Sequence, residues 1–274
     1  MPLPPFIENI LIRLADVLCD RRLYPAPDRR GLQDCKIIAH RGAHDNHRIF
    51  ENTMAAFCRA AEAGVWGIEL DIRWTRDQIP VVFHDPDLKR LFGRPEAIAA
   101  FTLNELQRQF PSIPSLANVV FRLGKKIHLM IEVKRQSRPG IRIQEKRLEE
   151  VLQPLEPVQD YHLLTLDPES LQPFTWIPPQ ARVAVADGWP GYSSRWVRRH
   201  GWGGVCGHYL LIGATMMGHH HQKRQRVGTG YIASANCLFR ELNRGVDWVF
   251  SNHAAALQQR VREYLHRPDQ WISD

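Results

Sequence analysis

The sequence predicts a single (β/α)8 barrel. Eight short runs rich in apolar and β-branched residues alternate with helical patterns along most of the chain. That alternation is typical of α/β folds built on a parallel sheet, and a length of 274 residues is common for one barrel domain. A doubly wound sheet is the main alternative, but no G-x-G-x-x-G motif follows the first predicted strand.

Apolar runs bounded by glycine, proline or polar residues locate the strands. The eight predicted strands are 36–40, 66–72, 127–133, 162–166, 182–186, 203–207, 230–234 and 248–251. The predicted helices are 53–64, 102–110, 115–124, 143–155, 193–201 and 236–245. Asn52 or Thr53 is placed to cap the first of these helices.

A ninth extended run, 81–84, follows the second strand too closely to be its parallel neighbour. A parallel crossover needs about a dozen residues, so this run must form an antiparallel hairpin with residues 66–72. A turn centred on Asp77–Gln78 would place His84 directly opposite Asp71. A slip of one residue would turn His84 to the other face.

Composition limits the classes of partner. The net charge of +7 favours anionic ligands. The hydrophobic fraction of 44% is enough for a substantial core. The basic patches lack interleaved aromatic residues, so no nucleic-acid partner is expected. Five cysteines without a C-x-x-C pair favour a reducing compartment. With no secretory signal pattern and no apolar run of about 20 residues, we expect a cytoplasmic protein without a transmembrane segment.

The first residues form a separate segment. Apolar residues fall on one helical face of residues 5–20, and a linker rich in proline and charge follows at 24–31. This helix could close one end of the barrel, or it could touch a lipid surface, which allows peripheral membrane contact. The predicted organisation is therefore 1–35 for the N-terminal helix and linker, 36–260 for the barrel domain and 261–274 for a C-terminal tail.

Acidic residues occupy strand positions that are normally apolar. Glu69 and Asp71 are at i and i+2, so they project from one face of a strand, and Glu132 ends the next barrel strand. Carboxylates buried together are costly unless a cation lies between them, and oxygen ligands suit Mg²⁺ or Ca²⁺. The alternative is an ion-pair network without metal, in which Lys134 balances the charge. Lys134 could instead hold a phosphate oxygen.

Two histidines and an arginine lie at the ends of extended runs. His40 and Arg41 end the first strand, Gly42 follows them, and His84 ends the hairpin. Arginine can bind a phosphate with two parallel hydrogen bonds, and two histidines can act as general base and general acid near neutral pH. A lone histidine at a strand end is more often structural. Here both histidines would share a rim with the three acids.

These residues belong to a series of short motifs. In chain order the motifs are "HRG" (40–42), "ENT" (51–53), "ELD" (69–71), "TRD" (75–77), "VVFHD" (81–85), "LKRLFG" (88–93), "IPSL" (113–116) and "EVK" (132–134). The series, together with "NRGVDWVFSNHAAAL" (243–257), resembles the glycerophosphodiester phosphodiesterase family over roughly residues 37–257.

The resemblance implies a (β/α)8 barrel that hydrolyses phosphodiesters with one bound divalent cation. It implies metal ligands at Glu69, Asp71 and Glu132, catalytic histidines at His40 and His84, and phosphate-binding residues at Arg41 and Lys134. Glu51 would hold Arg41 or the start of the helix, or contact the ligand. Asp85 would orient His84 or cap the strand.

The chain departs from the family pattern at three places. Gln78 replaces the usual glycine of the turn, Tyr231 replaces a tryptophan, and Ser251–Asn252 replaces Thr-Asp after the last strand. None is expected to touch the metal or the histidines. The last two are expected to line the substrate side.

Three functions fit these observations. The first is hydrolysis of a small glycerophosphodiester to glycerol 3-phosphate and an alcohol, with Mg²⁺ or Ca²⁺ and two-histidine acid–base catalysis. The second is a lysophospholipase D activity, with the same site chemistry on an acylated glycerol. The third is a phosphate-binding barrel without turnover, although binding alone needs no acid–base pair.

Overall fold

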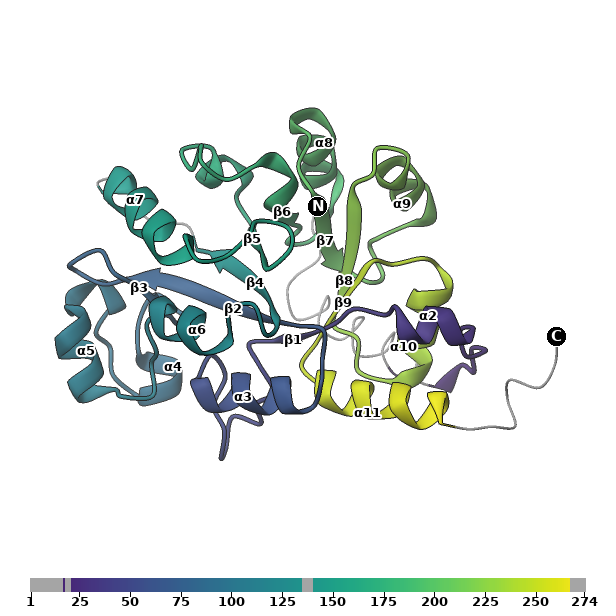
Figure 1. Ribbon diagram of the computed structural model, residues 1–274, viewed down its shortest axis with the longest axis horizontal. Helices are drawn as coiled ribbons and strands as arrows, with labels where there is room; N and C mark the ends of the chain where they lie inside the picture. The colour runs from purple at the N-terminus through teal and green to yellow at the C-terminus, as the bar shows by residue number, and fades with distance from the viewer. Residues whose placement is uncertain (1–16, 18–20, 135–139, 267–274) are drawn as a thin grey trace.

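Eight parallel strands close into a barrel, and a ninth strand is added outside it (Figure 1). The computed structural model describes residues 17, 21–134 and 140–266. Hydrogen-bonded strands follow the order β1-β9-β8-β7-β6-β5-β4-β2, and β1 also pairs with β2 to close the ring. The helices lie around the outside. The predicted (β/α)8 barrel is confirmed.

The strands are three to eight residues long. They are β1 (Ile37–His40), β2 (Gly67–Trp74), β3 (Pro80–Val82), β4 (His128–Val133), β5 (Tyr161–Thr165), β6 (Arg182–Val185), β7 (Gly204–His208), β8 (Arg226–Gly230) and β9 (Trp248–Ser251). All pairings are parallel except β2 with β3.

Most strand-to-strand connections contain a helix. The α-helices are α2 (Arg29–Gln33), α3 (Met54–Glu62), α4 (Lys89–Phe92), α5 (Leu103–Gln109), α6 (Leu116–Leu123), α7 (Ile141–Leu152), α8 (Gly191–His200), α9 (Ala214–His221), α10 (Ala235–Asn243) and α11 (Ala254–Leu265). Short 3-10 helices are η1 (Ile98–Ala100), η2 (Pro168–Leu171) and η3 (Pro179–Ala181). Thr53, rather than Asn52, caps α3 through a bond from the Ala56 amide.

Alternation along the strands separates two apolar cores. Ile68, Leu70 and Ile72 of β2 join the core between the strands and the helices, so Glu69 and Asp71 point to the other face, into the barrel. Lower in the barrel, the interior is filled by a second apolar cluster. Its members are Ile38, Met130, Leu164, Val183, Cys206, Trp248 and Phe250. The two acids therefore lie above a closed apolar floor.

The predicted strand at 230–234 is wrong by four residues. The strand is β8, Arg226–Gly230. Its two glycines interrupt the run of apolar residues from which the other strands were predicted. A Cβ atom added at Gly228 would lie 2.6 Å from the Cys206 sulfur and 2.9 Å from the Phe250 ring. The neighbouring strands supply the bulk inside the barrel, so β8 has glycine where a β-branched residue would clash.

The predicted hairpin is present, but its register differs by one residue. Ile72 pairs with Val82 and Trp74 pairs with Pro80, so the turn is centred on Asp77 and His84 is not opposite Asp71. Gln78 takes up a left-handed conformation (φ 59°) in this turn. The segment beyond β3 has its own small apolar core, which includes Phe83, Leu88, Phe101 and Phe110.

The two ends of the chain bear on the predicted N-terminal helix and on the domain boundaries. The predicted helix at 5–20 falls outside the described residues, apart from Val17. The division into 1–35, 36–260 and 261–274 stays a proposal, and α11 continues to Leu265. In the described part of the chain, no helix combines the length and the apolar character needed to cross a bilayer.

Candidate active site

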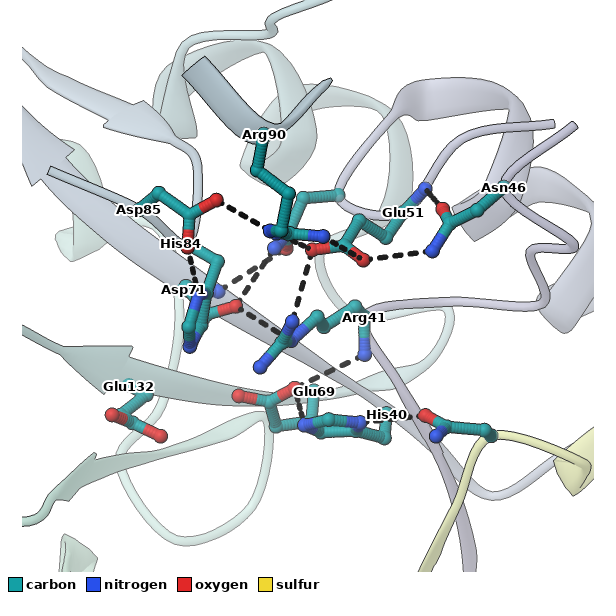
Figure 2. Close-up of polar contacts among 12 residues, drawn as sticks. His40, Arg41, Asn46, Glu51, Glu69, Asp71, His84, Asp85, Arg90 and Glu132 are labelled. Carbon is teal, nitrogen blue, oxygen red and sulfur yellow. Dashed lines mark hydrogen bonds and ion pairs between the residues drawn. The ribbon is translucent and has the colours of Figure 1, made fainter. Parts of the chain in front are cut away.

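An open pocket of about 230 Å³ lies at the carboxyl ends of the barrel strands. Six of the predicted site residues line it, namely His40, Arg41, Glu69, His84, Glu132 and Lys134. The other three, Asp71, Glu51 and Asp85, do not line the pocket but contact residues that do (Figure 2). The structure thus brings together every residue that the sequence predicted for the site.

Three carboxylates form one cluster inside the barrel. Glu69, Asp71 and Glu132 each offer an oxygen, and these oxygens all lie within 4.8 Å of one another. Asp71 and Glu132 are paired across neighbouring strands. All three side chains are buried.

The electrostatics of this cluster fit a cation. Burial, with the negative charges of Asp71 and Glu132, raises the pKa of Glu69 well above its ordinary value. Burial and Asp71 also raise the pKa of Glu132. Oxygen Oε1 of Glu69 is buried and has no hydrogen-bond partner among the described residues. Oxygen ligands of this kind suit a hard divalent cation, which would relieve the repulsion, so the residues present fit such an ion.

Asp71 is held ionised by its neighbours. Its oxygens contact the Lys134 ammonium at 2.7 Å and the Arg41 Nε at 3.3 Å. Asn52 donates a further hydrogen bond to Asp71 at 2.7 Å. Burial alone would raise the pKa of Asp71, but the charges of Lys134 and Arg41 outweigh it and lower that pKa.

Arg41 is aimed into the site by an unusual backbone. Arg41 has φ 56° and Gly42 has φ 83°, so the chain turns sharply as it leaves β1. The backbone amide of Arg41 donates to Glu69, and its guanidinium donates to Glu51 at 2.9 Å. A Cβ at Gly42 would lie 2.8 Å from Ala56 on α3, so this turn requires glycine.

His40 is held by a residue that the sequence analysis assigned elsewhere. Its Nδ1 donates to the side-chain oxygen of Asn252 at 2.7 Å, and its Nε2 lies 3.8 Å from Glu69. Burial and the charge of Arg41 lower the pKa of His40 to about 4. The expectation that Asn252 would not touch the histidines is therefore wrong. Asn252 directly follows β9, and β9 lies beside β1.

His84 reaches the pocket although the hairpin register differs from the prediction. β3 ends at Val82, so the alternation of a strand no longer fixes the direction of His84. The guanidinium of Arg73 holds the His84 carbonyl oxygen at 2.7 and 2.9 Å. The Nδ1 of His84 donates to Asp85 at 2.7 Å. Burial lowers the pKa of His84, and the nearby Arg41 and Lys134 add to this effect.

Comparison with known proteins finds similarity to one enzyme family. Residues 40–163 match the model of the glycerophosphoryl diester phosphodiesterase family, and this range holds all of the predicted site residues. This part of the chain is similar to the glycerophosphoryl diester phosphodiesterase family.

Relatives of the family are found in bacteria and in animals. A glycerophosphodiester phosphodiesterase of Caldanaerobacter subterraneus is 39% identical over 110 residues, which are 36% of this chain and 44% of the relative. Human glycerophosphodiester phosphodiesterase 1 is 37% identical over 94 residues, which are 32% of this chain and 28% of the relative. The matched part spans less than half the length of these curated relatives.

Solved structures of family members share the fold over a longer range. A phosphodiesterase of Oleispira antarctica, in complex with the product sn-glycerol-3-phosphate, has a TM-score of 0.71 at 23% identity, over 83% of this chain and 96% of that one. The glycerophosphodiester phosphodiesterase of Thermotoga maritima has a TM-score of 0.68 at 22% identity, over 82% and 98%.

Three further residues contact the site, and the sequence analysis did not assign any of them to it. Asn52 orients Asp71, Arg73 holds His84, and Arg90 contacts Asp85 and Glu51. Asn52 and Arg90 lie inside the motifs "ENT" and "LKRLFG", which was the available signal. Arg73 lies two residues after Asp71 on β2, and no motif marked it.

Proposed function

We propose that this protein hydrolyses glycerophosphodiesters to glycerol 3-phosphate and an alcohol. The observation that carries the proposal is the convergence of two carboxylates, two histidines and two cationic side chains in one pocket, with the third carboxylate, Asp71, in contact with its lining. The family supports the reaction class. The product bound to the Oleispira antarctica relative supports the glycerol phosphate part of the substrate.

We assign Glu69, Asp71 and Glu132 as the residues that hold one divalent cation, Mg²⁺ or Ca²⁺. When bound, such an ion neutralises phosphate charge and polarises the P–O bonds. The ion would stabilise the ionised forms of Glu69 and Glu132 most, because their negative charges repel each other and the charge of Asp71.

Arg41 and Lys134 hold the phosphate oxygens in this proposal. Both side chains are already fixed by carboxylates, Arg41 by Glu51 and Lys134 by Asp71. Donors that are fixed before the substrate binds stabilise developing negative charge without reorganising. The carboxylate neighbours raise the pKa of Lys134 even though burial opposes it, so it stays charged at neutral pH.

His84 acts as the general base and His40 as the general acid. Asp85 holds the Nδ1 proton of His84, which leaves Nε2 free to accept a proton, and its carboxylate stabilises the resulting imidazolium. His40 is neutral in the free protein because burial lowers its pKa to about 4. The negative charge of a bound phosphodiester favours the protonated form that His40 needs as an acid.

Two nucleophiles are compatible with this pair. Water would give the products in one step, whereas a neighbouring hydroxyl of the substrate would first give a cyclic phosphate. Both routes need a base at the nucleophile and an acid at the leaving oxygen. A transient cyclic phosphate in ³¹P spectra of the reaction would identify the second route.

The test is hydrolysis of glycerophosphocholine and glycerophosphoethanolamine, followed by the release of glycerol 3-phosphate. The reaction is run after EDTA treatment and again with Mg²⁺ or Ca²⁺ added. We expect EDTA to abolish turnover and one of the two ions to restore it. If the diesters bind but are not hydrolysed in any of these conditions, the result would favour the non-catalytic barrel instead.

The apolar part of the pocket lining favours a second candidate, lysophospholipase D activity. Leu164, Val185 and Phe250 line the pocket, and two further lining residues, Leu166 and Tyr231, are 46% and 65% exposed. An acyl chain could lie along these side chains. The double variant Leu166→Ser/Tyr231→Ser should then lose activity on lysophosphatidylcholine but keep it on glycerophosphocholine. Phe121→Ser, exposed away from this pocket, is the control, and equal effects on both substrates would exclude the acyl site.

A further inference from the structure

Arg90 connects two parts of the site that are far apart in the sequence. It lies on the short helix α4, and its side chain reaches back between Asp85 and Glu51 (Figure 2). Its Nε donates to Asp85 at 2.6 Å, and its two terminal nitrogens donate to the two oxygens of Glu51 at 2.6 and 3.1 Å. A single guanidinium thus binds two carboxylates at once.

Each of these carboxylates has a partner in the proposed catalytic machinery. The other oxygen of Asp85 holds the Nδ1 of His84 at 2.7 Å. Glu51 also accepts from Arg41 at 2.9 Å, and its side chain is 3% exposed. The chain of contacts therefore runs from His84 through Asp85, Arg90 and Glu51 to Arg41.

Arg90 also spans two pieces of the fold. His84, Asp85 and Arg90 belong to the segment after β3, which packs around its own apolar core. Glu51 and Arg41 belong to the connection between β1 and α3. His84 lies past the end of β3, so the strand ladder does not fix its ring. Arg73 holds its backbone carbonyl oxygen, and Asp85 holds the Nδ1 of its ring.

We propose that Arg90 is a positioning residue, which fixes Asp85 against Glu51 so that the His84 imidazole faces the pocket in line with Arg41. This inference rests on the proposed function. Arg90 itself does not line the pocket, so it acts through Asp85 and Glu51. Only a planar fork of donors can serve both carboxylates together, because a lysine ammonium is a single point of charge.

The first test compares three variants of the full-length protein at saturating metal. Arg90→Gln should lower kcat on glycerophosphocholine by about 10- to 100-fold, the usual effect of losing a residue that orients a site group, with KM changed less than about twofold. Arg90→Lys should retain part of the rate because it can still bind one carboxylate. Arg94→Gln is the matched control. It removes an ion pair with Glu96 in the same segment, away from the pocket, and should leave kcat unchanged.

A double-mutant cycle tests the path through Asp85. If Arg90 acts by fixing Asp85, then Arg90→Gln should cost much less in Asp85→Asn protein than in the wild type. Equal losses in both backgrounds would overturn the inference. So would an Arg90→Gln protein that melts at a lower temperature but keeps the wild-type kcat, since that result would mean a structural role only.

A measurement without turnover separates this inference from the proposed function. Long-range ¹H–¹⁵N spectra report which nitrogen of His84 carries the proton, with His84→Ala used for assignment. We expect the Nδ1–H form in the wild type and a mixture in Arg90→Gln. If the wild type proves inactive on the diesters, the proposed function fails, and these spectra still decide the role of Arg90. An unchanged tautomer in Arg90→Gln would overturn it.

Discussion

His84 is the proposed general base, and its replacement tests that role directly. Replacing it with alanine removes the base while leaving the acidic cluster and Arg41 in place. We expect kcat on glycerophosphocholine to fall by about 10²- to 10⁴-fold, the usual contribution of a general base. Steady-state kinetics on fully metallated protein measure this, with His219→Ala, an exposed histidine on α9, as the control. A His84→Ala protein with near-wild-type rates would rule out this mechanism.

Asn252 offers a second test at the scale of one side chain. Its oxygen fixes the Nδ1 proton of His40 and so leaves Nε2 on the side of Glu69. Asn252→Leu keeps the volume and removes the hydrogen bond, which is worth about 1 kcal/mol. We expect a fall in kcat of about fivefold, and no change for Asn104→Leu on the exposed face of α5. Unchanged kcat in Asn252→Leu would mean that the fold alone orients His40.

The sequence predicted the site residues whose positions follow from spacing along one strand. It missed residues that reach the site from segments distant in the chain. Glu69, Asp71 and Glu132 follow from the two-residue period of a strand, which sequence spacing records directly. Asn252 and Arg90 depend on which segments become neighbours in space, and spacing does not record that. Asn52 has φ 57°, and this left-handed conformation turns its side chain from the helix cap to Asp71.

At the scale of elements, the two errors in the strands involve glycine and turn geometry. The pattern of apolar residues located seven of the eight barrel strands, but β8 reads R-V-G-T-G and was placed too late in the chain. The β2–β3 hairpin was predicted from its short connection, and its register differs by one residue because the turn, which contains the left-handed Gln78, is centred on Asp77. Both errors concern backbone conformations that the apolar pattern does not encode.

The glycine in β8 gives a prediction about the stability of the barrel. Gly228→Ala would force a methyl group to within 2.6 Å of the Cys206 sulfur. Such overpacking usually costs about 1–3 kcal/mol of unfolding free energy. Gly218→Ala on α9 is the matched substitution, because nothing lies within 4 Å of its added Cβ, and it should stabilise by about 0.5–1 kcal/mol. Urea unfolding measures both, and equal midpoints would contradict the crowding that we infer inside the barrel.

At the scale of the whole molecule, the two ends of the barrel carry different buried ionisable groups. The open end holds the acidic cluster, whereas the amino-terminal end is filled by rings. His128 stacks on Trp66 with centroids 4.2 Å apart, and His162 lies against Trp248. His128 donates from Nδ1 to the Gln159 carbonyl and accepts at Nε2 from His162, 2.8 Å away. This chain of bonds fits two neutral rings, and neither histidine was singled out from the sequence.

The neutral pair predicts how the stability of the barrel depends on pH. Burial lowers the pKa of both histidines, and the charges of Arg226 and Lys36 add to this effect. The unfolded chain, with histidine pKa values of about 6.5, therefore binds protons before the folded chain does as the pH falls. The stability due to the pair is complete above pH of about 6.5 and decreases below it, by about 1.4 kcal/mol per histidine per pH unit.

The pair can be isolated from the other ionisable groups by difference. Urea unfolding from pH 7.5 to 5 compares the wild type with His128→Leu/His162→Leu in the same buffer, so that the acidic cluster contributes equally to both. We expect the double variant to lose less stability as the pH falls, because its unfolded state gains two fewer protons. If the two curves stay parallel over this range, the histidines are not neutral in the fold, and the bonding direction from His162 to His128 to Gln159 is wrong.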